Sequence, residues 1–185
     1  MFSGKSEELV RRLRRAVIGR QNVAVFKPAT DTRSHPERVV TRDDRAIDAL
    51  SVGSSEELLR RVDDDVDVVG IDEAQFFDDD LVTAVNRLAD AGVRVIVAGL
   101  DLDFQRRPFG PMPSLLTLAE YVDKMHAVCV VCGDPAHYSQ RIAGGEEQVL
   151  VGDTETYEAR CRSCYEPTLD RDAGVDQAGD REEEP

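Results

Sequence analysis

The sequence predicts a doubly wound parallel α/β sheet followed by a small appendage bracketed by cysteines. Over residues 1–128, short apolar runs alternate with segments of helical period, which is typical of a parallel sheet covered by helices on both faces. Two Cys-x-x-Cys pairs then enclose a segment that departs from this alternation, within residues 129–169. Residues 170–185 carry seven acids, two Arg and almost nothing apolar, which predicts a disordered acidic tail.

The individual elements follow from local patterns of apolar and capping residues. An apolar face recurs with helical period in three stretches, and the polar start at Ser54 supplies capping chemistry for a fourth helix. Residues 30–45 are polar and lack a period, so they predict a mobile loop. The predicted helices are 7–18, the segment from Ser54 onward, 81–91 and 115–121; the predicted buried strands are 23–26, 66–71, 93–98 and, as the last parallel strand, 128–131.

Composition narrows the possible functions. The formal net charge is -14, and a field of that sign repels the phosphate backbones of nucleic acids, so we expect no nucleic acid partner. No apolar run reaches 18 residues and the N-terminus has no apolar signal core, so we expect a cytoplasmic protein without a membrane partner. Only three of the 23 basic residues are Lys, and this acid-rich, Lys-poor composition favours adaptation to high salt over an ordinary acidic protein.

The N-terminal residues Ser3, Gly4, Lys5 and Ser6 match the second half of a phosphate-binding loop, whose full pattern is GxxxxGK[ST]. Backbone N–H groups at a helix N-terminus bind phosphate oxygens, Lys5 would reach the β- and γ-phosphates, and the Ser6 hydroxyl would ligate Mg²⁺. A merely polar helix start is the alternative for so short a motif. The first Gly and the strand before it are absent, so we expect that the natural protein starts further upstream or that the gene is truncated.

A second group is Asp72-Glu73, which ends the apolar run from Val66 to Ile71. In phosphate-loop enzymes an Asp at the end of such a strand holds Mg²⁺, and the next carboxylate can act as a base. Since consecutive side chains of a strand point to opposite sides, Asp72 can face the metal while Glu73 faces a second substrate. The alternative is an acidic strand end in an acid-rich chain.

The two Cys-x-x-Cys pairs predict a structural metal site. Four thiolates in two such pairs suit a closed tetrahedral Zn²⁺ site, which leaves no open position for catalysis. Without a signal core, a metal site is more consistent with the sequence than a disulfide framework, and buried free cysteines rarely fall into two such pairs. The predicted ligands are Cys129, Cys132, Cys161 and Cys164.

Taken together, these motifs resemble thymidine kinases of the zinc-containing type, over roughly residues 1–166. Several independent motifs occur in the family's order, which makes the resemblance specific. The matching stretches are 1–9, Phe26-Lys27-Pro28, Asp31-Thr32-Arg33, 71–77, Ala98-Gly99-Leu100-Asp101 leading to Phe104, Pro108-Phe109-Gly110, both Cys pairs and Tyr157-Glu158.

The resemblance implies the residues that bind ATP and its Mg²⁺. Ser3, Gly4, Lys5 and Ser6 would contact the phosphates, and Asp31 and Asp72 would help to hold the metal. Arg33 would steady the phosphates, and Gln75 would also contribute to the ATP site. Glu73 would be the general base that takes the proton from the 5′-hydroxyl as the γ-phosphate is transferred.

The resemblance also implies a nucleoside site and an assembly. Phe104 would lie against the base or sugar of thymidine, and Met1 and Tyr157 would border the thymine. Residues 149–157, including Val149 and Gly152, would form a lasso whose backbone reads the base edge. The family works as a homotetramer and is inhibited by thymidine triphosphate, so we expect both properties here.

Two other functions stay open at the level of sequence. One is a phosphate-loop ATPase with a zinc ribbon that acts on DNA, which would need a basic face that the net charge opposes. The other is a remnant that binds nucleosides but has lost catalysis. ATP hydrolysis stimulated by DNA would favour the first, and thymidine binding without turnover would favour the second.

Overall fold

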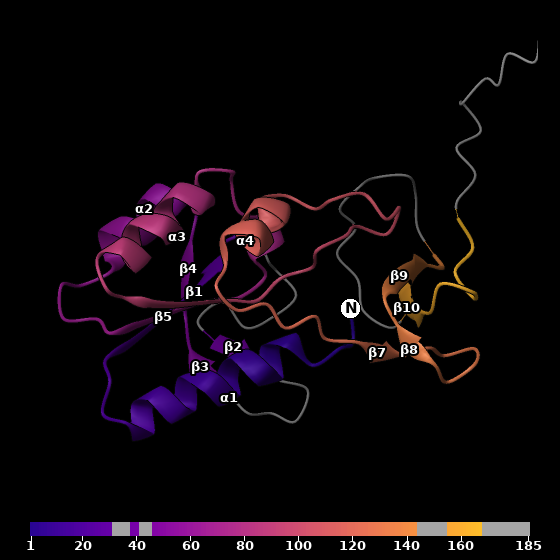
Figure 1. Cartoon of the computed structure of the whole chain (residues 1–185), viewed down its shortest axis with the longest axis horizontal. Helices are drawn as coiled ribbons and strands as arrows, with labels where there is room; N and C mark the ends of the chain where they lie inside the picture. Colours follow the sequence, from indigo (N-terminus) through magenta and orange to yellow (C-terminus); the bar gives the residue numbers. More distant parts are fainter. Residues whose placement is uncertain (31–37, 41–45, 144–154, 168–185) are drawn as a thin grey trace, which may run out of the picture.

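The computed structural model of the chain describes residues 1–30, 38–40, 46–143 and 155–167 (Figure 1). Within these residues, a four-stranded sheet has the order β4-β1-β5-β6, and every neighbouring pair of strands is parallel. The doubly wound parallel sheet predicted from the alternation is therefore confirmed. Its strands are β1 (Val23–Pro28), β4 (Leu50–Val52), β5 (Val68–Ile71) and β6 (Arg94–Val97).

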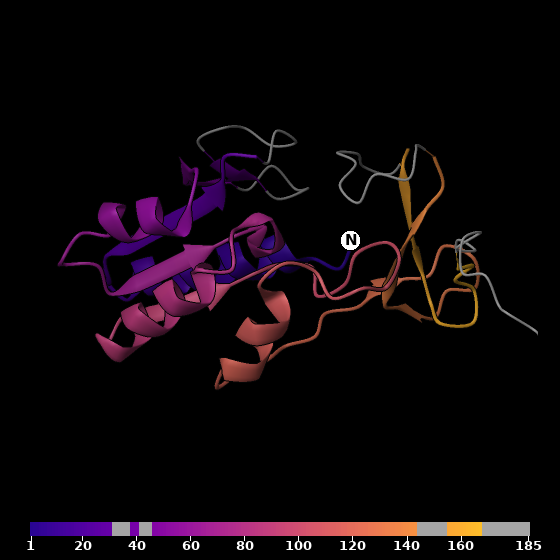
Figure 2. The same cartoon turned by 90° about the horizontal axis from the view of Figure 1, so that it is seen from above.

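Helices cover both faces of this sheet (Figures 1 and 2). The first, α1 (Lys5–Ile18), packs Leu9, Val10 and Leu13 against one face. Gly70 lies beneath α1, where an added Cβ would meet Leu13 at 2.7 Å, so glycine permits this close packing. The opposite face is covered by α2 (Ser55–Arg61) and α3 (Leu81–Asp90), with α4 (Met112–Leu118) contributing to the same core.

Most of the predicted helices and strands of the sheet agree with the structure, with differences at several places. Helix α2 begins as expected, since the Ser54 side chain accepts a hydrogen bond from the Glu57 N–H. Strand β1 runs through Pro28 rather than ending before it. The predicted helix 115–121 is α4, which starts at Met112 and stops at Leu118 because Ala119 is extended.

Part of the predicted loop 30–45 forms a strand. Residues Arg38–Val40 (β2) pair antiparallel with Ala46–Asp48 (β3), while 31–37 and 41–45 lie outside the described residues. The short strand β4 was not predicted from the sequence. Three residues are too few to show a period.

The predicted last parallel strand, 128–131, is wrong. Ala127–Val128 (β7) instead pairs antiparallel with Pro135–Ala136 (β8), and the chain turns between them. The turn is closed by hydrogen bonds from Gly133 N–H to the Cys129 carbonyl and from Cys129 N–H to the Asp134 carbonyl. The Cys-x-x-Cys turn therefore ends the strand after Val128.

A smaller unit contains β7, β8 and a second antiparallel pair, β9 (Tyr138–Arg141) and β10 (Tyr157–Arg160). In both views it lies beyond the end of the sheet near the N-terminus (Figures 1 and 2). Phe2 packs against its buried cluster, and the Tyr165 hydroxyl donates to the Phe104 carbonyl at 2.6 Å. The predicted tail, 170–185, lies outside the described residues.

Two further properties of the described part of the chain bear on function. Strand β6 pairs only with β5 among the described strands, so its other edge is open, and Val95, Ile96 and Val97 are only half-buried.

A membrane crossing by any of the described helices is ruled out, because none is long and apolar enough.

Candidate functional site

The N-terminus of α1 has the features of a phosphate-binding site. Gly4 precedes the helix with φ 78°, a left-handed conformation that glycine adopts without strain. No side chain caps this end, although the Glu8 N–H already bonds to the Gly4 carbonyl. The N–H groups of the first turn thus remain available for phosphate oxygens, and the helix dipole favours negative charge there.

Asp72 lies beside this helix start. Its carboxylate accepts hydrogen bonds from the Ser6 hydroxyl, at 2.9 Å, and from the Glu73 N–H, at 3.0 Å. The side chain is 6% exposed, and burial raises the pKa of Asp72 to about 6, with a further rise from the charge of Glu73. Lys5 and the Ser6 hydrogen bond act in the opposite direction. The structure therefore brings Lys5, Ser6 and Asp72, three of the predicted site residues, together.

Glu73 follows directly but in an unusual backbone conformation. Strand β5 ends at Ile71, and Glu73 has φ 50° and ψ 41°, the left-handed region that non-glycine residues seldom occupy. The sequence predicted that the side chains of Asp72 and Glu73 point to opposite sides because of strand pleating. Both residues lie after the end of the strand, so their directions are set by this turn instead. A short 3₁₀ turn, η1 (Ala74–Phe76), comes next.

Gln75 holds the Glu73 carboxylate in place. Its side-chain nitrogen donates to Glu73 Oε2 at 2.5 Å, and its oxygen accepts from the Leu100 N–H at 2.9 Å. Gln75 is 2% exposed. Both ends of its amide are engaged within the protein, which favours a role in positioning Glu73 over the predicted contact with ATP.

Phe104 and Tyr157 approach each other from different units. Phe104 lies in the segment after β6, and Tyr157 opens β10, yet both contact the guanidinium of Arg141 on β9. All three side chains are at least nine-tenths buried. Met1 lies at the same strand, where its amino group donates to the Ser139 hydroxyl at 2.8 Å. The predicted nucleoside residues Met1, Phe104 and Tyr157 thus converge around β9.

The four cysteines form one cluster, with all sulfur atoms within 4.8 Å of one another. Cys132 Sγ and Cys161 Sγ are 3.6 Å apart, close to the ~3.8 Å edge of a tetrahedron with Zn–S bonds of about 2.3 Å. All four are free thiols. The donor set and its geometry fit the predicted zinc site.

Hydrogen bonds among the cysteines shift the pKa values of their thiols in opposite directions. Burial opposes ionisation of Cys129, but backbone hydrogen bonds, chiefly from Cys161 and Cys132, outweigh it and lower its pKa to about 6. Hydrogen bonds with Cys161 and then Cys132 raise the pKa of Cys164 to about 12. Zn²⁺ binding would require deprotonated thiols, so it would release protons from this cluster.

The other predicted site residues cannot be placed. Asp31, Arg33, Val149 and Gly152 lie outside the described residues. The buried polar residues of β9 were not predicted from the sequence, and among them Arg141 contacts both Phe104 and Tyr157. The only local pattern in this segment is the run Tyr-Ser-Gln-Arg, which is typical of an ordinary half-exposed strand and does not indicate a binding site.

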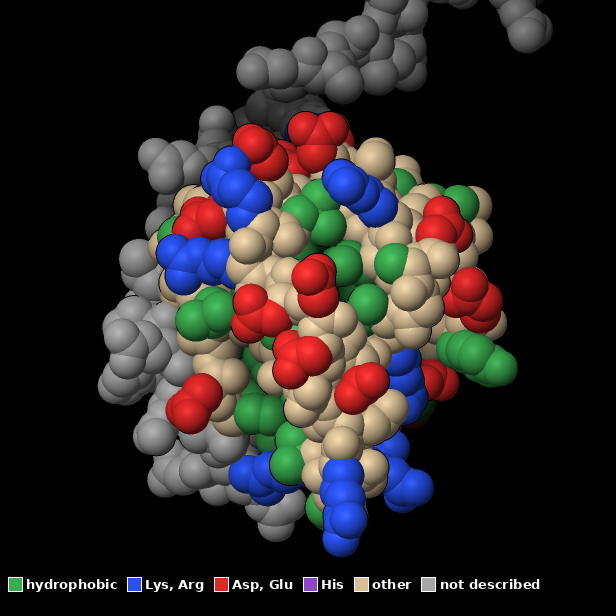
Figure 3. All heavy atoms as spheres, turned by 90° about the vertical axis from the view of Figure 1, so that its left-hand side faces the viewer, with side chains coloured by type: hydrophobic (Ala, Val, Ile, Leu, Met, Phe, Trp, Pro, Cys, Tyr) green, Lys and Arg blue, Asp and Glu red, His purple; other side chains and the backbone are tan. Residues whose placement is uncertain are grey.

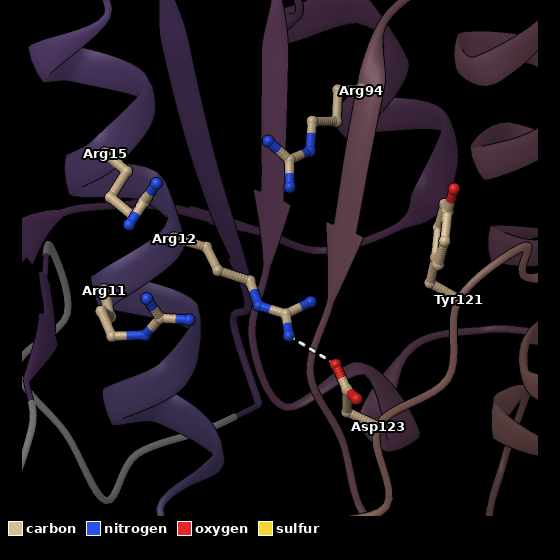
Figure 4. Close-up of a pocket in the computed structure, with 6 residues that line it drawn as sticks. All are labelled: Arg11, Arg12, Arg15, Arg94, Tyr121 and Asp123. Carbon is tan, nitrogen blue, oxygen red and sulfur yellow. Dashed lines mark hydrogen bonds and ion pairs between the residues drawn. The ribbon is translucent and has the colours of Figure 1, made fainter.

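Two cavities of the described structure lie elsewhere. One, of about 440 Å³, lies between α1, the start of β6 and the segment after α4 (Figure 4). In it the Arg12 guanidinium points toward the Asp123 carboxylate. The other, of about 430 Å³, borders the cysteine cluster on the side of His137. Neither is lined by Lys5, Asp72 or Glu73.

Surface charge is mixed on the side of the molecule that lies opposite the cysteine cluster. Figure 3 shows Asp and Glu side chains spread across this face, with Lys and Arg between and around them. A continuous basic surface is therefore missing from this face, where a nucleic acid backbone would need one.

Comparisons with known proteins identify one family. A sequence model of that family, described as thymidine kinase, matches residues 1–165. A thymidine kinase of Bacteroides thetaiotaomicron is 53% identical over 165 residues, covering 89% of this chain and 82% of that protein. A thymidine kinase of Bacteroides fragilis strain YCH46 is 51% identical over 172 residues, covering 93% and 86% respectively.

Proposed function

Because the chain belongs to the thymidine kinase family, we propose that it transfers the γ-phosphate of ATP to the 5′-hydroxyl of thymidine, giving thymidine monophosphate. The observation that carries this proposal is the junction of α1 and β5. There a helix N-terminus, the Ser6–Asp72 hydrogen bond and the Glu73 carboxylate lie within one short stretch of structure. The names of the relatives favour a nucleoside kinase over an ATPase that acts on DNA.

The phosphate side of the site depends on positioning and charge. Phosphoryl transfer requires neutralisation of the negative charge that the phosphate oxygens carry. The N–H groups of α1 and the Lys5 ammonium would bind these oxygens, while Ser6 and Asp72 would hold Mg²⁺. When bound there, Mg²⁺ would help to neutralise the charge of the phosphates. We propose that Asp31 and Arg33 complete this group.

The acceptor side depends on Glu73. A primary hydroxyl must lose its proton as the phosphoryl group arrives, and a carboxylate within hydrogen-bond reach can accept it. The hydrogen bond from Gln75 fixes the Glu73 carboxylate, and the Leu100 N–H in turn fixes Gln75. Glu73 is thus held in one orientation before substrate binds.

The nucleoside would occupy the region where the smaller unit meets the sheet domain. Thymine is neutral, so it is recognised by polar backbone groups and apolar contacts and needs no basic surface. Phe104 would lie against the base or sugar, Met1 and Tyr157 would border the thymine, and residues 149–157 would read its edge. The zinc site would hold the smaller unit against the loop that carries Phe104.

We also propose a homotetramer in the cytoplasm. Apolar side chains are exposed along the segment after α4, where Tyr121 is 89% exposed, and an interface between subunits would cover them. Four cysteines that form a metal site and no disulfide suit a reducing compartment. Light scattering on the purified chain measures the assembly, and a monomer at micromolar concentration would contradict the tetramer.

The test of the proposed function is Glu73→Gln. Glutamine keeps the size of the side chain and can still accept the Gln75 hydrogen bond, but it cannot accept a proton. We expect kcat to fall by about 10²–10⁴ while thymidine binding is largely kept. The matched control is Glu120→Gln, which removes an exposed acid and should leave kcat unchanged. A Glu73→Gln enzyme that turns over at the parent rate would show that Glu73 is not the base.

A further inference from the structure

We infer that Arg141 is a positioning residue that sets the affinity for thymidine by fixing Phe104 and Tyr157 relative to each other. The inference rests on the proposed placement of these two aromatic residues beside the nucleoside. Arg141 belongs to neither the phosphate site nor the cysteine cluster.

Arg141 makes two different contacts with the two rings. Its guanidinium carbon lies 3.6 Å from the centroid of the Phe104 ring, a distance at which cation and ring are in direct contact. Its Nη2 donates to the Tyr157 hydroxyl at 2.7 Å. A planar guanidinium can stack on one ring and donate in its own plane to another group at the same time, which a lysine ammonium cannot do.

The backbone holds Arg141 in a fixed place for these contacts. Arg141 and Tyr157 are directly opposite each other in the antiparallel pair β9–β10. Phe104 comes from the sheet domain, and its carbonyl accepts the hydrogen bond of the Tyr165 hydroxyl. The Phe104 ring is therefore held through its side chain by Arg141 and through its backbone by Tyr165, both from the smaller unit.

The burial of Arg141 argues against a role in packing alone. The residue is 9% exposed, and a buried guanidinium loses much of its hydration. An apolar side chain of similar length would fill the same volume without that loss. Arg141 instead adds directional contacts: its guanidinium restricts the tilt of the Phe104 ring, and its donation to the Tyr157 oxygen restricts the position of that hydroxyl.

The consequence for substrate binding is specific. With Arg141 in place, both rings are ordered before thymidine arrives, and binding costs less conformational entropy. Without Arg141, each ring must be ordered by the substrate itself. The loss should therefore appear in thymidine binding and leave the phosphate site and the proton transfer nearly unchanged.

The test compares Arg141→Met and Arg141→Lys with Phe104→Leu and the double variant Arg141→Met/Phe104→Leu. The matched control is Arg162→Met, which removes an exposed arginine whose guanidinium lies 5.4 Å from the Tyr138 ring in the same unit. For each holoenzyme we would measure kcat, KM for thymidine and for ATP, the increase in melting temperature caused by thymidine alone, and zinc content.

We expect Arg141→Met to raise KM for thymidine about tenfold, because it removes a desolvated cation–ring contact and a charged hydrogen bond. The melting shift caused by thymidine should shrink in parallel, while kcat and KM for ATP change less than about threefold. Arg141→Lys should recover part of the affinity. The double variant should bind thymidine no more weakly than Phe104→Leu, because Arg141 acts largely through that ring.

Three results would overturn the inference. One is an Arg141→Met enzyme with the thymidine KM of the Arg162→Met control, while Phe104→Leu raises that KM. Another is a fall in kcat with KM for thymidine unchanged. The third applies if Arg141→Met does not fold or loses zinc. The Arg141→Lys variant then replaces it in the test, and an unchanged KM for thymidine in Arg141→Lys would overturn the inference. If Phe104→Leu itself has no effect, the proposed placement of Phe104 fails instead.

Discussion

The buried carboxylate of Asp72 gives a prediction in which stability and activity change in opposite directions. Burial and the neighbouring Glu73 raise the pKa of Asp72 from 3.8 to about 6, so the metal-free folded protein holds the ionised carboxylate at a cost. Each pKa unit corresponds to about 1.4 kcal/mol, which makes this cost about 3 kcal/mol. Asp72→Asn removes this cost and keeps an oxygen that can accept from the Glu73 N–H, but it replaces the oxygen that accepts from the Ser6 hydroxyl by an amide nitrogen, a loss of about 1 kcal/mol.

We therefore expect Asp72→Asn to raise the free energy of unfolding by about 2 kcal/mol at pH 8 in the absence of Mg²⁺. The sign depends on pH. A folded-state pKa above the unfolded value makes the protonated form the stabilised one, so the cost is present above about pH 6 and is lost as the pH falls toward 3.8. The advantage of the variant should shrink by pH 5 and reverse near pH 4.

The assay is urea unfolding at several pH values, in Mg²⁺-free buffer without a chelator, so that the zinc site is preserved. Asp64→Asn, which removes an exposed acid and the same unit of charge, is the control and should show no comparable gain. Activity of Asp72→Asn should be lost, since the proposed Mg²⁺ ligand is gone. A variant less stable than the parent at pH 8, or a stability difference that does not vary between pH 5 and 8, would refute this account of Asp72.

Three other predictions follow from single features. Protein purified without added zinc should contain about one Zn²⁺ per chain, and a ratio near zero with four freely titratable thiols would contradict the zinc site. Gly110→Ala should lower the melting temperature more than Gly92→Ala, because only at Gly110 would the new Cβ meet backbone, 2.3 Å from the Gln75 carbonyl oxygen; equal losses would mean that backbone strain alone matters. Ser54→Ala should cost about 1 kcal/mol of unfolding free energy by urea titration, and no loss would show that the cap of α2 contributes nothing.

The sequence predicted those parts of the site whose residues belong to short motifs. Ser6 and Asp72, which are 66 positions apart, each lie in a short motif at the end of a predicted element, and the cysteine cluster followed from the two Cys-x-x-Cys pairs. Both depend on local backbone geometry that a motif specifies. The fold class followed from the alternation of periods for the same reason.

The contacts of Arg141 could not be predicted in this way. They join three segments whose separations along the chain carry no pattern, and they depend on how the smaller unit docks on the sheet domain. The error at 128–131 has a related origin. Those residues are apolar enough for a buried strand, but the chain turns after Val128, where the cysteine cluster begins. The spacing of apolar residues along the sequence does not indicate such a turn.

The backbone at Glu73 has a consequence for how this enzyme can be improved. A φ of 50° suits glycine or asparagine better than glutamate, whereas the proposed chemistry at this position requires a carboxylate. Selection for heat resistance alone would therefore drift toward Gly or Asn at position 73 and accumulate stable, inactive proteins. A library screened for robustness should keep this codon fixed and seek its gains elsewhere on the scaffold.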